Sequence, residues 1–262
     1  TWHETGIEFF GTFGKGYATF DYQALIVTGL NANGFDRNNW VAGGKQGFFE
    51  VDNFTSPAYV ARLDYRGVPG LRIGGSFYYC VNTASNSDKV ATYAGVKAPL
   101  RIYTVDGQYK NKYVTARTNF VFGNLTGATA ISNKNKGLSN SSPYTRVVQV
   151  AKKAVSYAGE VGVNLRSICN GNKKVPVIYP FARYEYYNPQ EAGEKGQLPM
   201  DKRNQVSMWT AGLNWYALPN LVVKADYMTR QIGTGKVFGK GKYNSENEFS
   251  IGIAYVGWFI KK

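Results

Sequence analysis

The segment 177–230 restricts the possible folds of this chain more than any other, because its residues alternate between two kinds of side chain. At its end, Lys224, Asp226 and Arg230 share one parity, and mostly apolar side chains share the other. Successive side chains of a β-strand point to opposite faces, so the pattern predicts a strand with one charged and one apolar face. The two strand-like segments before it alternate in the same way. Consecutive two-sided strands of about ten residues are typical of a sheet with water on one side and lipid on the other.

The composition agrees with strands of this kind. The chain holds 20 Tyr, 15 Phe and 30 Gly, which favours strands, aromatic belts and turns over helices. Its mean hydropathy is −0.33, and no apolar run reaches the roughly 18 residues that a membrane helix needs. Strands of a transmembrane barrel hide their apolar residues in the alternation, so a low mean hydropathy does not argue against them.

The alternation recurs along the chain and predicts eleven strands. We expect them at 4–13, 17–28, 58–66, 71–80, 100–109, 113–123, 154–165, 177–187, 206–216, 221–230 and 248–259. The connections are in turn short, at 14–16, 67–70, 110–112, 170–176 and 217–220, and long, at 29–57, 81–99, 124–153, 188–205 and 231–247. Outer-membrane barrels combine short periplasmic turns with long outer loops, and a soluble sandwich has no reason to do so.

The sequence therefore predicts an all-β fold, an antiparallel transmembrane β-barrel that forms a single domain over residues 1–262. The order of the loops makes the C-terminus periplasmic. A complete barrel of this kind has an even number of strands, so we expect at least one strand upstream of Thr1 to be absent. The alternative is a further strand hidden in 29–57 or 124–153.

Few residues of the chain suggest catalysis or metal binding. His3 is the only histidine, and no CxxC, HExxH or P-loop motif is present. We expect Cys80 and Cys169 at opposite ends of the sheet, too far apart for a disulfide. The sequence predicts a protein that is not an enzyme and has no cofactor and no metal site.

Several motifs carry a family resemblance. They are Y-P-F-A-R-Y-E-Y at 179–186, T-A-G-L-N-W-Y-A-L-P-N-L-V-V-K-A-D-Y at 210–227, P-G-L-R-I-G-G-S-F at 69–77 and the ending F-S-I-G-I-A-Y-V-G-W-F. The chain resembles the phosphate-selective (O/P-type) porin family of Gram-negative outer membranes. The resemblance implies a 16-stranded barrel, usually a homotrimer, of which these strands would be the last eleven. The family's ladder of lumenal arginines does not match this sequence residue by residue.

Charged residues of the polar parity would line the interior of such a barrel. The basic ones are Arg62, Arg66, Arg72, Arg117, Arg183, Lys224 and Arg230, and the acidic ones are Asp21, Asp64, Asp106, Glu160, Glu185 and Asp226. The two signs are close to balanced. For each residue, pairing within the wall and direct contact with a solute remain equal alternatives.

The net charge of +14 therefore arises mostly outside the walls. The loop 124–153 carries no acidic residue and five basic ones: Lys134, Lys136, Arg146, Lys152 and Lys153. Folded into the lumen, this loop would form a positive constriction that favours anions. Outside the lumen, it would be a solvated cap with little effect on selectivity.

We therefore expect an outer-membrane porin for passive diffusion of small solutes, with a preference for anions such as phosphate. Its expected partners are outer-membrane lipid, lipopolysaccharide, small anionic solutes and copies of itself in a homotrimer. The basic residues are spread out and form no arginine-rich helix, so we expect no nucleic-acid partner. The alternative is a barrel with a closed lumen that has a structural or docking role in a larger outer-membrane assembly.

Overall fold

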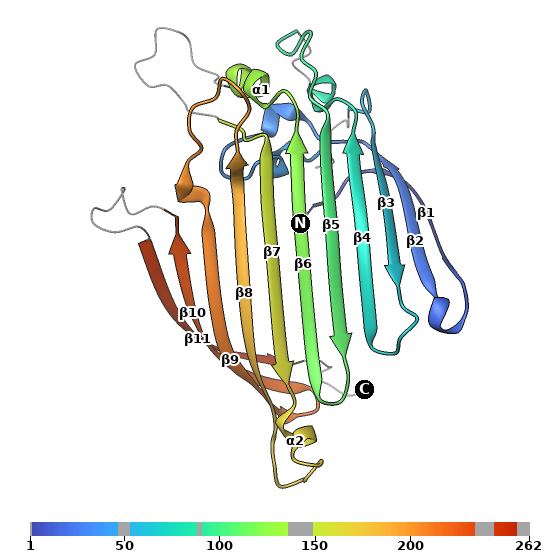
Figure 1. The fold of residues 1–262 in the computed structure, drawn as a ribbon, viewed down its shortest axis with the longest axis vertical. Helices are drawn as coiled ribbons and strands as arrows, with labels where there is room; N and C mark the ends of the chain where they lie inside the picture. Colours follow the sequence, from blue (N-terminus) through green and yellow to red (C-terminus); the bar gives the residue numbers. More distant parts are fainter. Residues whose placement is uncertain (1, 47–52, 88–90, 136–148, 234–243, 256–262) are drawn as a thin grey trace, which may run out of the picture.

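The computed structural model describes residues 2–46, 53–87, 91–135, 149–233 and 244–255. It is all-β, with eleven antiparallel strands joined in chain order into one sheet (Figure 1). The strands are β1 (Gly6–Phe13), β2 (Phe20–Val27), β3 (Ala58–Tyr65), β4 (Leu71–Cys80), β5 (Leu100–Lys110), β6 (Val114–Leu125), β7 (Lys153–Val163), β8 (Val177–Ala192), β9 (Val206–Leu218), β10 (Leu221–Ile232) and β11 (Asn244–Tyr255). The predicted number, type and neighbour order of the strands are confirmed.

The connections separate to the two ends of the sheet, as the sequence predicted (Figure 1). The long ones hold the helices η2 (Ala32–Gly34), η3 (Ala42–Gly44), η4 (Thr83–Asn86), α1 (Ala128–Lys134) and η5 (Lys202–Asn204). The short ones hold η1 (Gly16–Ala18) and α2 (Leu165–Ile168). The described parts of 29–57 and 124–153 contain no strand beyond the ends of β6 and β7, so the alternative of a further strand is not found in those parts. Cys80 and Cys169 are free and lie at opposite ends.

Some strands run further than expected: β11 begins at Asn244 and not at 248, and β8 shows the largest extension. The sequence predicted an end at 187 because Asn188 and Pro189 resemble a loop, but β8 continues to Ala192. Its register with β7 shifts between Lys153 and Val155. Such a bulge tolerates a proline, which has no N–H to donate to the ladder.

The sheet is curved, and within the described residues it is not closed (Figure 1). β1 pairs with β2 and β11 pairs with β10, and these two edge strands are not paired with each other. Among the described residues no helix is long and apolar enough to cross a lipid bilayer, and this observation does not bear on segments that cross as strands.

The register separates the side chains of the sheet into two unlike faces. Residues paired across neighbouring strands share a face. One row contains Asp21, Asp64, Gly74, Asp106 and Asn119, and another contains Arg72, Gln108, Arg117, Glu160 and Arg183. We call this side of the sheet the charged face.

The opposite side, the apolar face, contains rows such as Tyr22, Leu63, Gly75, Val105, Phe120, Tyr157 and Tyr186. Many of its large side chains are exposed, among them Ile7, Phe9, Leu63, Val105, Phe120, Trp209, Phe249, Ile251 and Ile253. Aromatic rings of neighbouring strands contact each other here, as in Tyr184 and Trp209, whose centroids are 4.6 Å apart. Its charged side chains, Arg101 and Lys153, stand at the long-loop ends of β5 and β7.

Ion pairs link neighbouring strands on the charged face. Asp64 is only 1% exposed and accepts hydrogen bonds from Arg62 (Nη2–Oδ1, 2.6 Å) and Arg72 (Nε–Oδ1, 2.9 Å). Arg62 also contacts Asp106 at 2.7 Å. The buried Asp64 carboxylate thus joins β3 to β4, and Arg62 extends the cluster to β5.

Replacing that carboxylate tests its contribution. Asp64→Asn leaves two guanidiniums close together, with Arg62 retaining Asp106 and Arg72 losing its acidic partner. We expect a loss of about 2–3 kcal/mol in the free energy of unfolding, measured by urea unfolding in detergent. Asp226→Asn is the control, because Asp226 lies on the same face and makes no ion pair within the described residues. Equal losses in the two variants would contradict a structural role for the shared carboxylate.

Candidate functional site

The long connection 29–57 folds back over the charged face. Its residues Leu30, Phe35 and Trp40 are buried in one cluster with Val27 and Ile102. Val27 and Ile102 have the parity of the charged residues of β2 and β5, so the cluster covers the charged face where the strands meet the long loops. We call residues 29–46 the strap.

Trp40 holds the strap against the sheet. Its indole Nε1 donates to the Ala151 carbonyl oxygen at 2.9 Å. Its ring lies against Gly123 of β6, where a Cβ would come within 1.9 Å of Cη2. Trp40 has a φ of 53°, a left-handed backbone that is rare for a bulky residue. Because Gly123 has no side chain, the Trp40 ring can pack against β6 at this position, and the strap contacts the sheet there.

Two other long connections form hydrogen bonds with the strap and with each other. The carboxylate of Glu194 accepts from the backbone N–H groups of Gly127 and Thr129 at the start of α1 (3.1 and 3.0 Å). At the other end of α1, the Asn135 amide donates to the carbonyl oxygens of Ala32 and Phe35 in the strap (2.9 and 3.0 Å). α1 thus joins the strap to the connection that precedes β9.

Gln190, which is 3% exposed, fixes the same connection from β8. Its amide donates to the Gln149 carbonyl oxygen at 2.7 Å and accepts from the Asp201 backbone N–H at 3.1 Å. The Asn204 amide donates to Gln190 Oε1 (3.1 Å) and to the Arg37 carbonyl oxygen (3.2 Å). These bonds hold the tip of the strap beside the start of β9.

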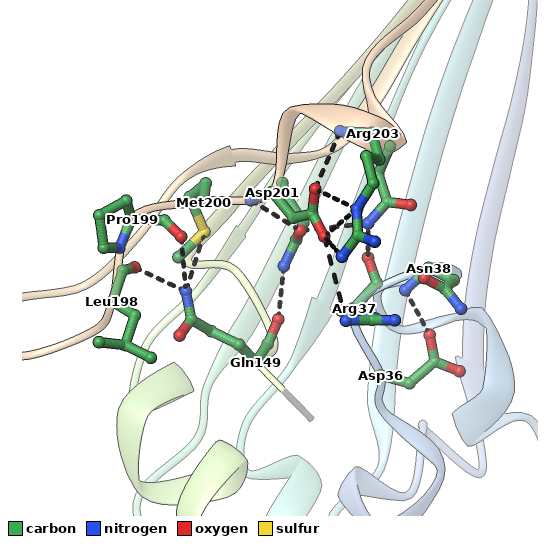
Figure 2. Close-up of polar contacts among 11 residues, drawn as sticks. Asp36, Arg37, Asn38, Gln149, Leu198, Pro199, Met200, Asp201 and Arg203 are labelled. Carbon is green, nitrogen blue, oxygen red and sulfur yellow. Dashed lines mark hydrogen bonds and ion pairs between the residues drawn. The ribbon is translucent and has the colours of Figure 1, made fainter. Parts of the chain in front are cut away.

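An arginine pair shares one carboxylate at this junction (Figure 2). Arg203 Nε donates to Asp201 Oδ1 at 2.9 Å and Oδ2 at 2.8 Å, and Arg37 Nη1 lies 4.0 Å from Oδ2. The hydrogen bonds from Arg203 hold the pKa of Asp201 below its usual range, because they stabilise the charged form. Both guanidinium-bearing side chains are partly exposed, Arg37 by 36% and Arg203 by 48%.

The predicted wall residues lie on the charged face, and most of them pair with each other. Besides the Asp64 cluster, Glu160 accepts from Arg117 (2.6 Å) and from Arg183 Nε (2.7 Å) across β6, β7 and β8. Glu185 lies 3.8 Å from Arg183. The remaining pairs are Arg66 with Asp21 (2.7 Å) and Arg230 with Glu246 (2.8 Å). Of the two alternatives, pairing within the wall accounts for these contacts.

Lys224 differs from the other basic wall residues, because it makes no ion pair within the described residues. It lines a hollow of about 800 Å³ on the charged face near the short turns. The charged residues of this hollow are Arg66, Arg72, Lys110, Arg117, Lys224 and Glu160. Lys110 and Lys224 are exposed and make no ion pair within the described part of the chain. The hollow therefore has a surplus of positive charge.

The basic loop is only partly described. Lys136 and Arg146 lie outside the described residues. Lys134 is exposed at the end of α1, and Lys152 is half-buried. Lys153 is the first residue of β7 and pairs with Asn124, which pairs with Arg101, so it belongs to the apolar face. This placement does not suit the lumenal role expected for Lys153.

Sequence analysis missed the strap and its contacts at Arg37, Trp40 and Asp201. The segment N-G-F-D-R-N-N-W at 33–40 resembles an ordinary polar loop. Its two aromatic residues, Phe35 and Trp40, were the available signal, because large aromatic side chains in a polar loop commonly bury their rings.

No protein-family model matches the chain, and no curated protein matches it. Within the described residues, no three His, Cys, Asp or Glu side chains come together as a metal site.

The strap's position depends on the missing side chain at Gly123. Gly123→Ala places a methyl group in the space of the Trp40 ring, so the ring must move. We expect amide hydrogen exchange at 36–40 to rise at least about tenfold, because such overpacking costs about 1–3 kcal/mol. Gly159→Ala is the control, since a Cβ there meets nothing within 4 Å. Unchanged exchange in Gly123→Ala would show that Trp40 is not held by this contact.

The junction should depend on pH through Asp201. A carboxyl whose pKa is lowered by folding stabilises above its usual pKa of about 3.9 and loses that contribution as the pH falls through its folded pKa. The stability difference between the wild type and Asp201→Asn should therefore be constant above about pH 5 and shrink below about pH 4. Urea unfolding of both proteins between pH 3 and 7 measures this difference in the free energy of unfolding. A difference that persists unchanged at pH 3 would contradict the ion pair.

Proposed function

We propose that the chain is part of an outer-membrane porin through which small solutes diffuse passively, with a preference for anions such as phosphate. The observation that carries the anion preference is the hollow on the charged face, where five basic side chains surround the single acidic residue Glu160. A concave surface of one sign focuses the electric field and raises the local concentration of the opposite ion.

The proposed membrane setting rests on the apolar face. An array of exposed apolar and aromatic side chains across a whole sheet is unfavourable in water and favourable against lipid. Arg101 and Lys153 stand at the rim of that face, where their long side chains reach the headgroups and lipopolysaccharide.

Closure of the sheet is also proposed. The edge strands β1 and β11 each have one paired neighbour in the described chain. Free strand edges are not tolerated in a bilayer, so strands beyond these eleven would complete a barrel. The 16 strands and the homotrimer implied by the resemblance to phosphate-selective porins fit such a barrel.

The strap favours a second candidate, a barrel with a closed lumen and a structural or docking role. The strap, α1 and the connection before β9 bind each other over the charged face. If they block the mouth, no current will flow.

Planar-bilayer recording separates the two candidates. We expect a stable conductance whose reversal potential under a salt gradient has the sign of anion selectivity. Lys110→Gln with Lys224→Gln should reduce the permeability ratio of anion to cation about two- to fivefold, because it removes the unpaired charges of the hollow. No conductance in the wild type would favour the closed barrel.

The matched control is Lys173→Gln with Lys174→Gln, which removes the same charge from an exposed turn at the same end of the sheet. Its permeability ratio should equal that of the wild type. An equal reduction in both double variants would indicate an effect of net charge and remove the hollow from the selectivity mechanism.

A further inference from the structure

The junction at the tip of the strap is built like an anion-binding site whose ligand is a side chain of the protein. Asp201 gives its carboxylate to two guanidiniums, and the two oxygens of the carboxylate receive the Arg203 side chain in a forked geometry. A planar guanidinium binds a free carboxylate or a phosphate in the same way.

The backbones that carry the two arginines have supporting contacts besides the Asp201 carboxylate. Arg203 lies in η5, where the backbone N–H groups at 204 and 205 donate to backbone carbonyl oxygens (3.2 and 3.1 Å). The backbone of Arg37 is held by the Asn204 amide (3.2 Å), and Asn204 is held in turn by Gln190 Oε1 (3.1 Å). The strap behind Arg37 is anchored by Trp40 and Ala151. Because these backbone contacts do not need the carboxylate, the two segments that carry the arginines stay beside each other when it leaves.

The acidic side chain of the strap itself, Asp36, is already engaged in hydrogen bonds. Asp36 accepts from the backbone N–H groups of Asn38 and Asn39, both at 2.7 Å, and from the Asn39 amide at 3.3 Å. It therefore stabilises its own turn and is not a second ligand for the arginines. Asp201 alone among the described acidic residues contacts both guanidiniums.

We propose that Arg37 and Arg203 form a binding site for a small carboxylate or oxyanion solute, and that Asp201 is a resident competitor for it. The proposal rests on the proposed porin function, in which the strap lies on the route of the solute. An anion from outside displaces the carboxylate of Asp201 from the guanidiniums, and the return of the carboxylate releases the anion. The resident carboxylate thus keeps binding weak, as passage through a channel requires.

The test measures binding and current separately. Inorganic phosphate is titrated into the detergent-purified protein by calorimetry, and the phosphate concentration that halves the chloride current is measured in planar bilayers. Asp201→Asn keeps a side chain that can still accept from the Arg203 backbone N–H and cap η5, but it removes the competing charge. We expect phosphate to bind about five- to tenfold more tightly and to block at a correspondingly lower concentration.

Two further variants isolate the site. Glu191→Gln removes one negative charge from an exposed residue at the long-loop end of β8. The Glu191 carboxylate accepts a hydrogen bond from the Asn188 amide. The phosphate affinity of this variant should stay within about twofold of the wild type. Adding Arg37→Gln to Asp201→Asn should return the affinity to the wild-type value. Background binding at the hollow near the short turns is common to all four proteins and cancels in the comparison.

The outcomes are distinguishable. Equal effects of Asp201→Asn and Glu191→Gln, or no effect of Asp201→Asn, would overturn the site even if the protein conducts. Tighter phosphate binding in Asp201→Asn that Arg37→Gln abolishes would support the site even if no variant conducts, and in that case the porin function alone would fail.

Discussion

The two-residue period of the strands, kept in register through eleven neighbours, is the constraint on which the rest of this structure depends. A shift of one residue in any strand would move its charges to the opposite face. The observed register brings Asp64 beside Gly74 and Glu160 beside Arg183, so charges meet charges or small residues. The apolar face therefore has charged side chains only at its rim, and the other charged side chains of the strands lie together on the charged face.

On the charged face, pairs of arginines share a single carboxylate. Asp64 and Glu160 each serve two arginines from different strands. The Glu160 carboxylate links β6, β7 and β8, and the Asp64 carboxylate links β3 and β4. Where the acidic residues end, toward the short turns, Lys110 and Lys224 stay unpaired within the described chain. The same arrangement therefore stiffens the middle of the wall and concentrates positive charge at one end.

Local sequence was enough to predict the sheet. Alternation along segments such as 221–230 determines a strand and its faces, and the alternating connection lengths determine neighbour order. The extension of β8 beyond 187 escaped prediction, because a bulge beside Pro189 is a tertiary compensation. The strap escaped for a related reason. Trp40 contacts Gly123 and Ala151, more than eighty residues away, and no local pattern encodes which loop covers which strand.

The strap adds a second place where selectivity of the proposed channel could arise. The basic loop was expected to be either a constriction or a solvated cap, and its described residues include the exposed Lys134 and, on the apolar face, Lys153. The residues that stand over the charged face come instead from the strap and from the connection before β9, with Arg37 and Arg203 opposing one Asp201. Loops fixed by Trp40 and Gln190 hold these few charges at defined positions. In the proposed channel, the position of these charges would then matter more for anion binding than the number of basic residues in a loop.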